Sequence, residues 1–266
     1  MSLSEQKVID IKYMINKKEN NIYFDHISEI MPYFQRLIEK LEVIKEQVIK
    51  NSNLRDHDQD ARLIELDAMQ MDIQQVRMWM NAFFSLASKC STPHNQFDQN
   101  EFLHLLGSNL ALKQTENYMF KTLRLGFVTL QHFKLDSLFY SVLCELNVMK
   151  KSSIKSYSYK VKEILNNSIG MNEAKKDCLL AFAYIRNSLH TNGIHRNRSI
   201  DINIDNIQFS FEKGKKLECA GWKHVVILLE KNIDILEEIL NADTIMNLKN
   251  VIKDDFAEQE LFSRLD

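Results

Sequence analysis

The sequence is poor in the two residues that most often mark loops and turns. Its 266 residues include 6 glycines and 2 prolines, where average usage would give roughly 30 of the two together. Sandwiches and barrels need turn residues about every dozen positions, and α/β sheets need glycine at many strand-to-helix turns. The scarcity therefore excludes all-β and doubly wound folds and favours long helices joined by few connections.

The chain also lacks an excess of charge of one sign. It has 34 Lys and Arg against 36 Asp and Glu, a formal net charge of -2. The molecule as a whole therefore has no field that attracts nucleic acid or an anionic membrane, and any such partner must meet a local patch. A hydrophobic content of 45% and a charged content of 26% are typical of a globular protein.

Membrane, secretion and metal signals are missing as well. No apolar run approaches the roughly 18 residues that span a bilayer, and the first residues lack the apolar core of a signal peptide. The cysteines are scattered without a C-x-x-C pair, which argues against a disulfide framework and a zinc site. They are Cys90, Cys144, Cys178 and Cys219. We expect a cytoplasmic protein with no membrane partner, metal or other cofactor.

Apolar residues recur at helical spacing through most of the chain. The three longest patterns cover residues 20–50, 56–90 and 114–149. Pro32 marks either a kink in the first of them or the first turn of its main part. Shorter patterns predict a helix ending near Leu165, helices over 172–190 and 222–240, and a last helix capped by Asp243 and running towards Phe262.

One segment changes from helical spacing to strict alternation. Ile200, Ile202 and Ile204 alternate with polar residues, as do the apolar residues at 207, 209 and 211, with Asp205-Asn206 as the turn between them. We therefore predict an all-α antiparallel helical bundle with long helices and one small β-hairpin near residues 200–212. Residues 1–110 would form a long-helix hairpin and 111–266 a bundle, unless the two make one continuous domain. A polar loop at 91–95 is the candidate boundary.

The segment with the clearest chemistry follows the predicted helix 172–190. Between Cys178 and Ile200 the chain has no acidic residue. The basic and titratable side chains there are Arg186, His190, His195, Arg196 and Arg198. On a helix, Arg186 and His190 lie one turn apart at the edge of an apolar face, where a guanidinium and an imidazole can grip one phosphate. We expect Asn192-Gly193 to end this helix, with Gly193 in the left-handed conformation.

A structural role is the alternative for the same residues. Cations in the last turn of a helix interact favourably with its dipole and bond to its unpaired carbonyls. Arg186, His190 and Arg196 are therefore candidates for helix capping.

The string Ile185-Arg186-Asn187-Ser188-Leu189-His190, followed by Asn192-Gly193, a hairpin and an amphipathic helix, resembles the HEPN superfamily (higher eukaryotes and prokaryotes nucleotide-binding) over about residues 160–240. That family is an all-α bundle whose signature is an Arg, usually a polar residue after it, and a His several residues further on. Its members are commonly metal-independent endoribonucleases of toxin, antiphage and RNA-processing systems, with a composite site where two copies meet.

The resemblance implies a role for each matching residue. Arg186 would bind the scissile phosphate, Asn187 would orient it, and a His would move the proton of the ribose 2′-hydroxyl, which leaves a cyclic phosphate. Three residues separate Arg186 from His190 and eight separate it from His195, and neither is the usual spacing. We favour His190, with His195 as the second candidate.

Further phosphate contacts and partners follow from the same resemblance. Asn192, Arg196 and Arg198 are the expected additional phosphate-binding residues. The expected partners are RNA or a nucleotide, a second copy of the chain, and an antitoxin or a nucleotidyltransferase. The alternative function is a non-catalytic interaction module, in which the long N-terminal helices present a binding surface and the Arg/His segment only caps and dimerises.

Three other groups contain residue types that are found in metal or ligand sites. The string 56–60 contains the His57-Asp58 pair of metal-dependent phosphohydrolases, with His26 upstream, but acidic residues are common at helix starts. Glu101-x-x-His104 is half of a helical di-iron motif, which needs two copies. Several Met and aromatic residues could line a ligand cavity but are more typical of core packing. They are Met69, Met71, Met78, Trp79, Met80, Phe83 and Phe84.

Overall fold

The computed structural model describes residues 18–52, 54, 59–91, 109–151, 153–204, 207–248 and 251–252. In this part of the chain the elements are α2 (Lys18–Asn51), α3 (Ala61–Ser91), α5 (Asn109–Glu145), α6 (Tyr157–Asn167), α7 (Glu173–His190), β1 (Ile200–Ile204), β2 (Ile207–Phe211), α8 (Trp222–Leu240) and α9 (Asp243–Met246). The prediction of an all-α bundle with one small inserted hairpin is confirmed.

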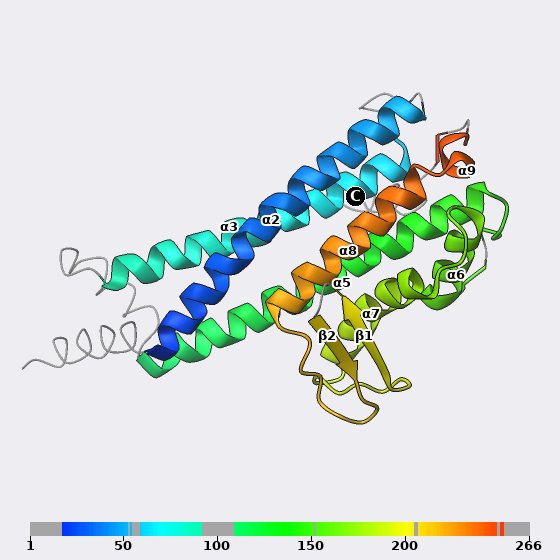
Figure 1. Ribbon diagram of the computed structural model, residues 1–266. Coiled ribbons are helices and arrows are strands. Elements are labelled where there is room, and N and C mark those ends of the chain that lie inside the picture. The colour runs from blue at the N-terminus through cyan, green and yellow to red at the C-terminus, as the bar shows by residue number, and fades with distance from the viewer. Residues whose placement is uncertain are drawn as a thin grey trace, which may run out of the picture.

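The four long helices α2, α3, α5 and α8 run beside one another along the molecule (Figure 1). Helix α2 packs between α3 and α8, and α5 packs against α3 on one side and against α6 and α7 on the other. The pair α2 and α3 is antiparallel, because Glu42 bonds to Gln70 and, further back along α2, Gln35 bonds to Arg77. The hairpin pairs β1 with β2 in antiparallel register, Ile200 opposite Phe211.

An aromatic cluster joins the first, middle and last long helices. Phe34 of α2 lies 5.9 Å from Phe127 of α5 and 6.1 Å from Trp222 of α8, measured between ring centroids. Phe127 and Trp222 are 5.8 Å apart, and all three side chains are buried. Such ring pairs add to the free energy gained by burial alone. The hydrophobic core is therefore continuous from the N-terminal helix pair into the C-terminal half of the chain.

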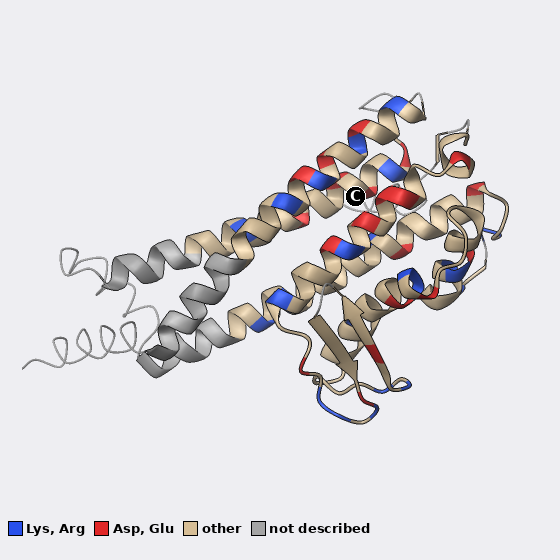
Figure 2. Ribbon diagram, viewed as in Figure 1, with Lys and Arg blue, Asp and Glu red and all other residues tan. Residues whose placement is uncertain are grey.

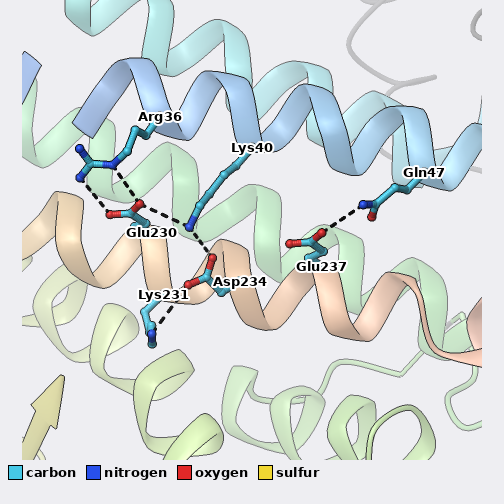
Figure 3. A network of polar contacts seen from close by, with 7 residues as sticks. All are labelled: Arg36, Lys40, Gln47, Glu230, Lys231, Asp234 and Glu237. Atoms are coloured by element: carbon cyan, nitrogen blue, oxygen red, sulfur yellow. Dashed lines mark hydrogen bonds and ion pairs between the residues drawn. The ribbon is translucent and has the colours of Figure 1, made fainter. Parts of the chain in front are cut away.

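Polar contacts run along the line where α2 meets α8 (Figure 3). Arg36 Nε lies 3.3 Å from Glu230 Oε1, and Lys40 Nζ lies 3.3 Å from the same oxygen and 2.5 Å from Asp234 Oδ1. Burial alone would raise the pKa of Glu230, but the Arg36 hydrogen bond and the charges of Lys40 and Arg36 outweigh it and lower that pKa. These contacts set the register between two helices that lie far apart in the sequence.

A buried ion pair between Asp60 and Arg62 lies at the start of α3. Asp60 is the N-cap of α3: its Oδ1 accepts the backbone N–H of Arg62 and the Arg62 Nε–H, each at 2.9 Å, and its Oδ2 accepts from Arg62 Nη2 at 3.0 Å. Arg62 also donates to Ser52 Oγ and to the carbonyl of Ile245. The N–H of Ile252 completes the group by donating to Asp60 Oδ2 at 2.9 Å. One pair thus links the ends of α2 and α9 to the start of α3.

Some predicted boundaries were wrong. Helix α9, the last in the described part of the chain, ends at Met246, and Ala242 rather than Asp243 is its N-cap, with Asp243 in the first turn. The third long helix ends at Glu145, two residues before Asn147 takes a left-handed φ of 58°. Pro32 lies inside α2, which continues on both sides of it.

The Met and aromatic residues of α3 divide between the core and the surface. Met69 and Met80 are fully buried, whereas Met71, Met78 and Trp79 are exposed. They therefore do not line a common cavity. The structure describes the backbone but not the side chains of His26, Phe83 and Phe84. The pair His57-Asp58 and the Glu101-x-x-His104 motif lie outside the described residues.

Replacement of Arg62 by Ala is expected to lower the free energy of unfolding by about 3 to 5 kcal/mol, because it leaves the buried Asp60 carboxylate without its cation. Lys176→Ala, which breaks an ion pair with the largely exposed Glu173, should cost about 1 kcal/mol or less. Urea denaturation of the two variants measures the difference. Equal destabilisation by both would show that the buried pair has no special weight.

Candidate functional site

Helix α7 presents the predicted site at its C-terminus. It starts after Asn172, whose side chain accepts the N–H of Lys175 at 3.1 Å, and its apolar face buries Phe182 and Ile185 in the core. The helix ends at His190, as the pattern predicts. Gly193 has a φ of +83° and donates its N–H to the Ser188 carbonyl at 2.7 Å, so the expected left-handed glycine is present.

The Ser188 carbonyl at this helix end is satisfied by residues beyond the helix. Thr191 Oγ1 lies within hydrogen-bonding distance of the carbonyls of Asn187 (3.2 Å), Ser188 (3.1 Å) and Ile194 (2.6 Å). The N–H groups of Thr191 and Gly193 also bond to the Ser188 carbonyl. The turn therefore caps this carbonyl, and the described side-chain contacts of Arg186 and His190 are not to carbonyls of the helix end.

Arg186 lies half-buried between α7 and α5. Its Nη1 donates to Asn187 Oδ1 at 2.9 Å, and its Cζ lies 5.2 Å from the centroid of the Phe133 ring, a cation–π contact. Its Nε is buried without a hydrogen-bond partner. Among the described residues no carboxylate pairs with this guanidinium.

His190 is exposed one turn further along. Its Nε2 lies 3.3 Å from the hydroxyl oxygen of Thr129 on α5. The pairs Phe133–Arg186 and Thr129–His190 follow one another in opposite sense along the two helices, which shows that α5 and α7 run antiparallel here. Asn187 and Asn192 are also exposed. The structure thus brings Arg186, Asn187 and His190 to one surface, beside α5.

His195 lies in a different environment. It is 1% exposed, and its ring packs against the rings of Tyr184 and Phe211 at 5.4 and 5.5 Å. Its Nε2 lies 3.0 Å from the Arg198 carbonyl and its Nδ1 lies 3.5 Å from Ser188 Oγ. Because Nε2–H donates to the Arg198 carbonyl, the His195 side chain stabilises the loop after α7. Its ring is enclosed and is therefore not accessible to a large substrate.

Two loops pair at the end of the hairpin opposite the turn between β1 and β2. His195 donates its N–H to the Lys215 carbonyl at 3.0 Å, and Leu217 donates to the Gly193 carbonyl at 2.7 Å. Segment 191–199 is thereby held against segment 212–217. Figure 2 shows Lys and Arg in both loops.

The paired loops are strongly basic. Their cations are Arg196, Arg198, Lys213, Lys215 and Lys216, against the single acid Glu212, which pairs with Lys215. Arg196 and Arg198 are exposed. The three lysines were missing from the predicted site, although the run Lys213-Gly214-Lys215-Lys216 is a visible signal; their place beside Arg196 depends on the pairing of the loops.

A second group of polar side chains, which the sequence patterns did not predict, lies between α5 and α6. His132 is 6% exposed and its ring centroid lies 4.5 Å from that of Tyr157. Next to them Lys160 Nζ lies 2.6 Å from Asp136 Oδ1. His132 Nδ1 and the Tyr157 hydroxyl are buried without hydrogen-bond partners. No sequence signal links these residues to Arg186, since they come from helices about 25 to 55 positions earlier.

The charge of Arg186 reaches this group. The pKa of His132 is lowered to about 4: burial is the largest cause, Asp136 opposes it, and the charges of Arg186 and Lys160 add to the lowering. His132 is therefore neutral at pH 7.

In the described part of the chain, no three His, Cys, Asp or Glu side chains gather as potential metal ligands, and no helix there has the length and apolar character needed to cross a bilayer.

The shifted pKa of His132 predicts a specific pH dependence of stability. His132 takes up a proton near pH 6.5 in the unfolded chain but only near pH 4 in the folded protein. Below pH 6.5 the unfolded chain therefore binds more protons, and the free energy of unfolding falls as the pH decreases towards 4. Between pH 7 and pH 5 this residue should remove about 2 kcal/mol from the free energy of unfolding. Urea denaturation at several pH values measures it.

The control for this prediction is a pair of Gln variants. His132→Gln should reduce the loss of stability between pH 7 and pH 5 by that amount, while His190→Gln, at an exposed site, should leave it unchanged. Parallel pH profiles for wild type and His132→Gln would contradict the assignment.

Comparison of the chain with models of protein families, with curated proteins and with solved structures found no match. The function of the site must therefore be inferred from its geometry: an exposed His190, an Arg186 without a carboxylate partner and a pair of basic loops.

Proposed function

We propose that the protein is a HEPN-like RNA-binding protein that cleaves RNA without a metal ion, through Arg186, Asn187 and His190. One observation carries the proposal. The Ser188 carbonyl near the end of α7 accepts the N–H groups of Thr191 and Gly193, and none of the described side-chain contacts of Arg186 and His190 is to a carbonyl of this helix end, so hydrogen-bonded capping does not account for these two residues. Their described side-chain partners are the neutral Asn187, Phe133 and Thr129, which leaves the positive charge for a substrate phosphate.

Each side chain has a role that its contacts support. Arg186 binds the phosphate with its guanidinium. Asn187 orients this guanidinium, because its Oδ1 accepts a hydrogen bond from Arg186 Nη1. Thr129 holds the His190 ring through Nε2, and Nδ1 accepts the proton of the ribose 2′-hydroxyl. The 2′-oxygen then attacks phosphorus, the 5′-oxygen of the next nucleotide leaves with a proton, and a 2′,3′-cyclic phosphate forms.

The leaving oxygen needs a general acid, and a single copy of the site has one exposed imidazole. His195 is enclosed and cannot take this part. The proposal therefore includes a homodimer, in which His190 of a second copy donates the proton. The family resemblance adds a setting, a toxin or antiphage system, with an antitoxin or a nucleotidyltransferase as a further protein partner.

The purified protein is expected to cleave at least one RNA in a broad panel in the presence of EDTA, with cyclic phosphate at the new 3′ ends. Arg186→Ala and His190→Ala should each lower the rate at least 100-fold, because they remove phosphate binding and proton transfer. Arg77→Ala, at a surface Arg of α3, is the matched control and should cleave normally. Gel assays and end-group analysis measure these results.

The proposal fails if every RNA remains intact, or if cleavage depends on added metal or is unaffected by both site variants. A non-catalytic interaction module is then the better description. The exposed Met71, Met78 and Trp79 of α3 favour that second function, because large apolar side chains gathered on one helix are typical of protein contacts. In that case Met78→Lys should abolish a protein contact while Arg186→Ala leaves it intact.

A further inference from the structure

Two large apolar side chains stand exposed on α5 beside the site. Phe133 is 49% exposed and Leu130 is 44% exposed. They are three positions apart on a helix and are therefore neighbours on its surface. Thr129, which contacts His190, comes just before them in the chain. The apolar pair thus adjoins the cationic end of α7.

Arg186 connects the apolar pair to the phosphate site. Its guanidinium carbon lies 5.2 Å from the centroid of the Phe133 ring, so the cation covers part of the ring while about half of the side chain faces solvent. Proteins that bind single strands combine cations that follow the phosphates with aromatic rings on which the bases stack. Phe133 and Arg186 place one element of each kind in direct contact.

We propose that Phe133, with Leu130 beside it, is a stacking platform for a nucleobase of single-stranded RNA whose neighbouring phosphate is bound by Arg186. This inference rests on the proposed function and names its substrate class. A base within a duplex already stacks on both faces, so an exposed ring selects unpaired bases.

The charges around the platform match such a strand. No acidic residue lies between Cys178 and Ile200, and the paired loops that follow α7 continue the positive charge with Arg196 and Arg198. Charge complementarity therefore favours a polyanion as the occupant of the Phe133 ring itself, while the second copy in the proposed function supplies only its His190 at the phosphate. A protein contact through Phe133 remains an outcome that the experiment below detects.

The test measures the affinity of a fluorescent single-stranded 2′-O-methyl oligoribonucleotide, which lacks the attacking hydroxyl and stays intact. Phe133→Leu should weaken binding about tenfold, as expected for the loss of one stacked base, and Phe133→Trp should retain it. The matched control is Trp79→Leu, which removes a similarly exposed aromatic side chain (56%) from α3 and should change nothing. When the same oligonucleotide is part of a duplex, the Phe133→Leu variant and the wild-type protein should bind it with equal affinity.

A second arm separates stacking from the positioning of Arg186. An abasic site is moved along the oligonucleotide, and at one position wild-type affinity should fall about tenfold while Phe133→Leu shows no further loss. If Phe133→Leu loses affinity but both proteins respond equally to every abasic site, Phe133 only positions Arg186 and the inference is overturned.

Failure of the inference is distinguishable from failure of the proposed function. If Arg186→Ala loses RNA binding and Phe133→Leu does not, the proposed function stands and the platform is rejected. If Phe133→Leu instead dissociates a dimer in analytical ultracentrifugation without changing RNA affinity, the face is a contact between copies, which also overturns the inference. If wild type and Arg186→Ala bind RNA equally weakly, the proposed function itself falls.

Discussion

The packing of α5 against α3, α6 and α7 is the constraint on which the rest of the structure depends. Helix α3 covers one side of it, and α6 and α7 cover the other. A helix enclosed in this way must bury polar positions along with apolar ones, and Gln131 and His132 are both buried. Its partly covered edge carries Thr129 and Phe133, which meet the last turns of α7. The same helix thus supports the core and one wall of the candidate site.

Two groups of buried polar side chains differ in how completely they are hydrogen-bonded. Asp60 and Arg62 are fully buried and use their hydrogen-bonding capacity on each other, on Ser52 and on the backbone of Ile245 and Ile252. Near the candidate site, His132 Nδ1, the Tyr157 hydroxyl and Arg186 Nε have no such partners. Native proteins satisfy nearly all buried polar groups, and departures concentrate where function requires them. The first group is therefore structural, whereas the second belongs to a wider set of buried atoms that lack a partner in the described part of the chain, since Trp222 Nε1 and the Asn232 amide of α8 are among them.

Local patterns were sufficient for most elements of the fold. Period-two alternation located the hairpin because both strands bury one face against the core: Ile202 and Ile204 of β1, and Phe209 and Phe211 of β2. The end of α7 was likewise readable, since Asn192 and Gly193 adopt the left-handed conformation that such residues favour. The motif residues Arg186, Asn187 and His190 were found because they lie close together in the sequence.

What could not be predicted depends on contacts between distant segments. The helical pattern after Asp243 continues, yet α9 stops at Met246, and Ile252 instead bonds to Asp60 and Ala61 at the start of α3. Electrostatics follows the same rule. A net charge of -2 conceals a separation: Glu230 and Asp234 of α8 are neutralised by Arg36 and Lys40 of α2, whereas no described carboxylate pairs with Arg186. Because these two acids are paired with cations of α2, they do not offset the positive charge at the end of α7, which acts at short range.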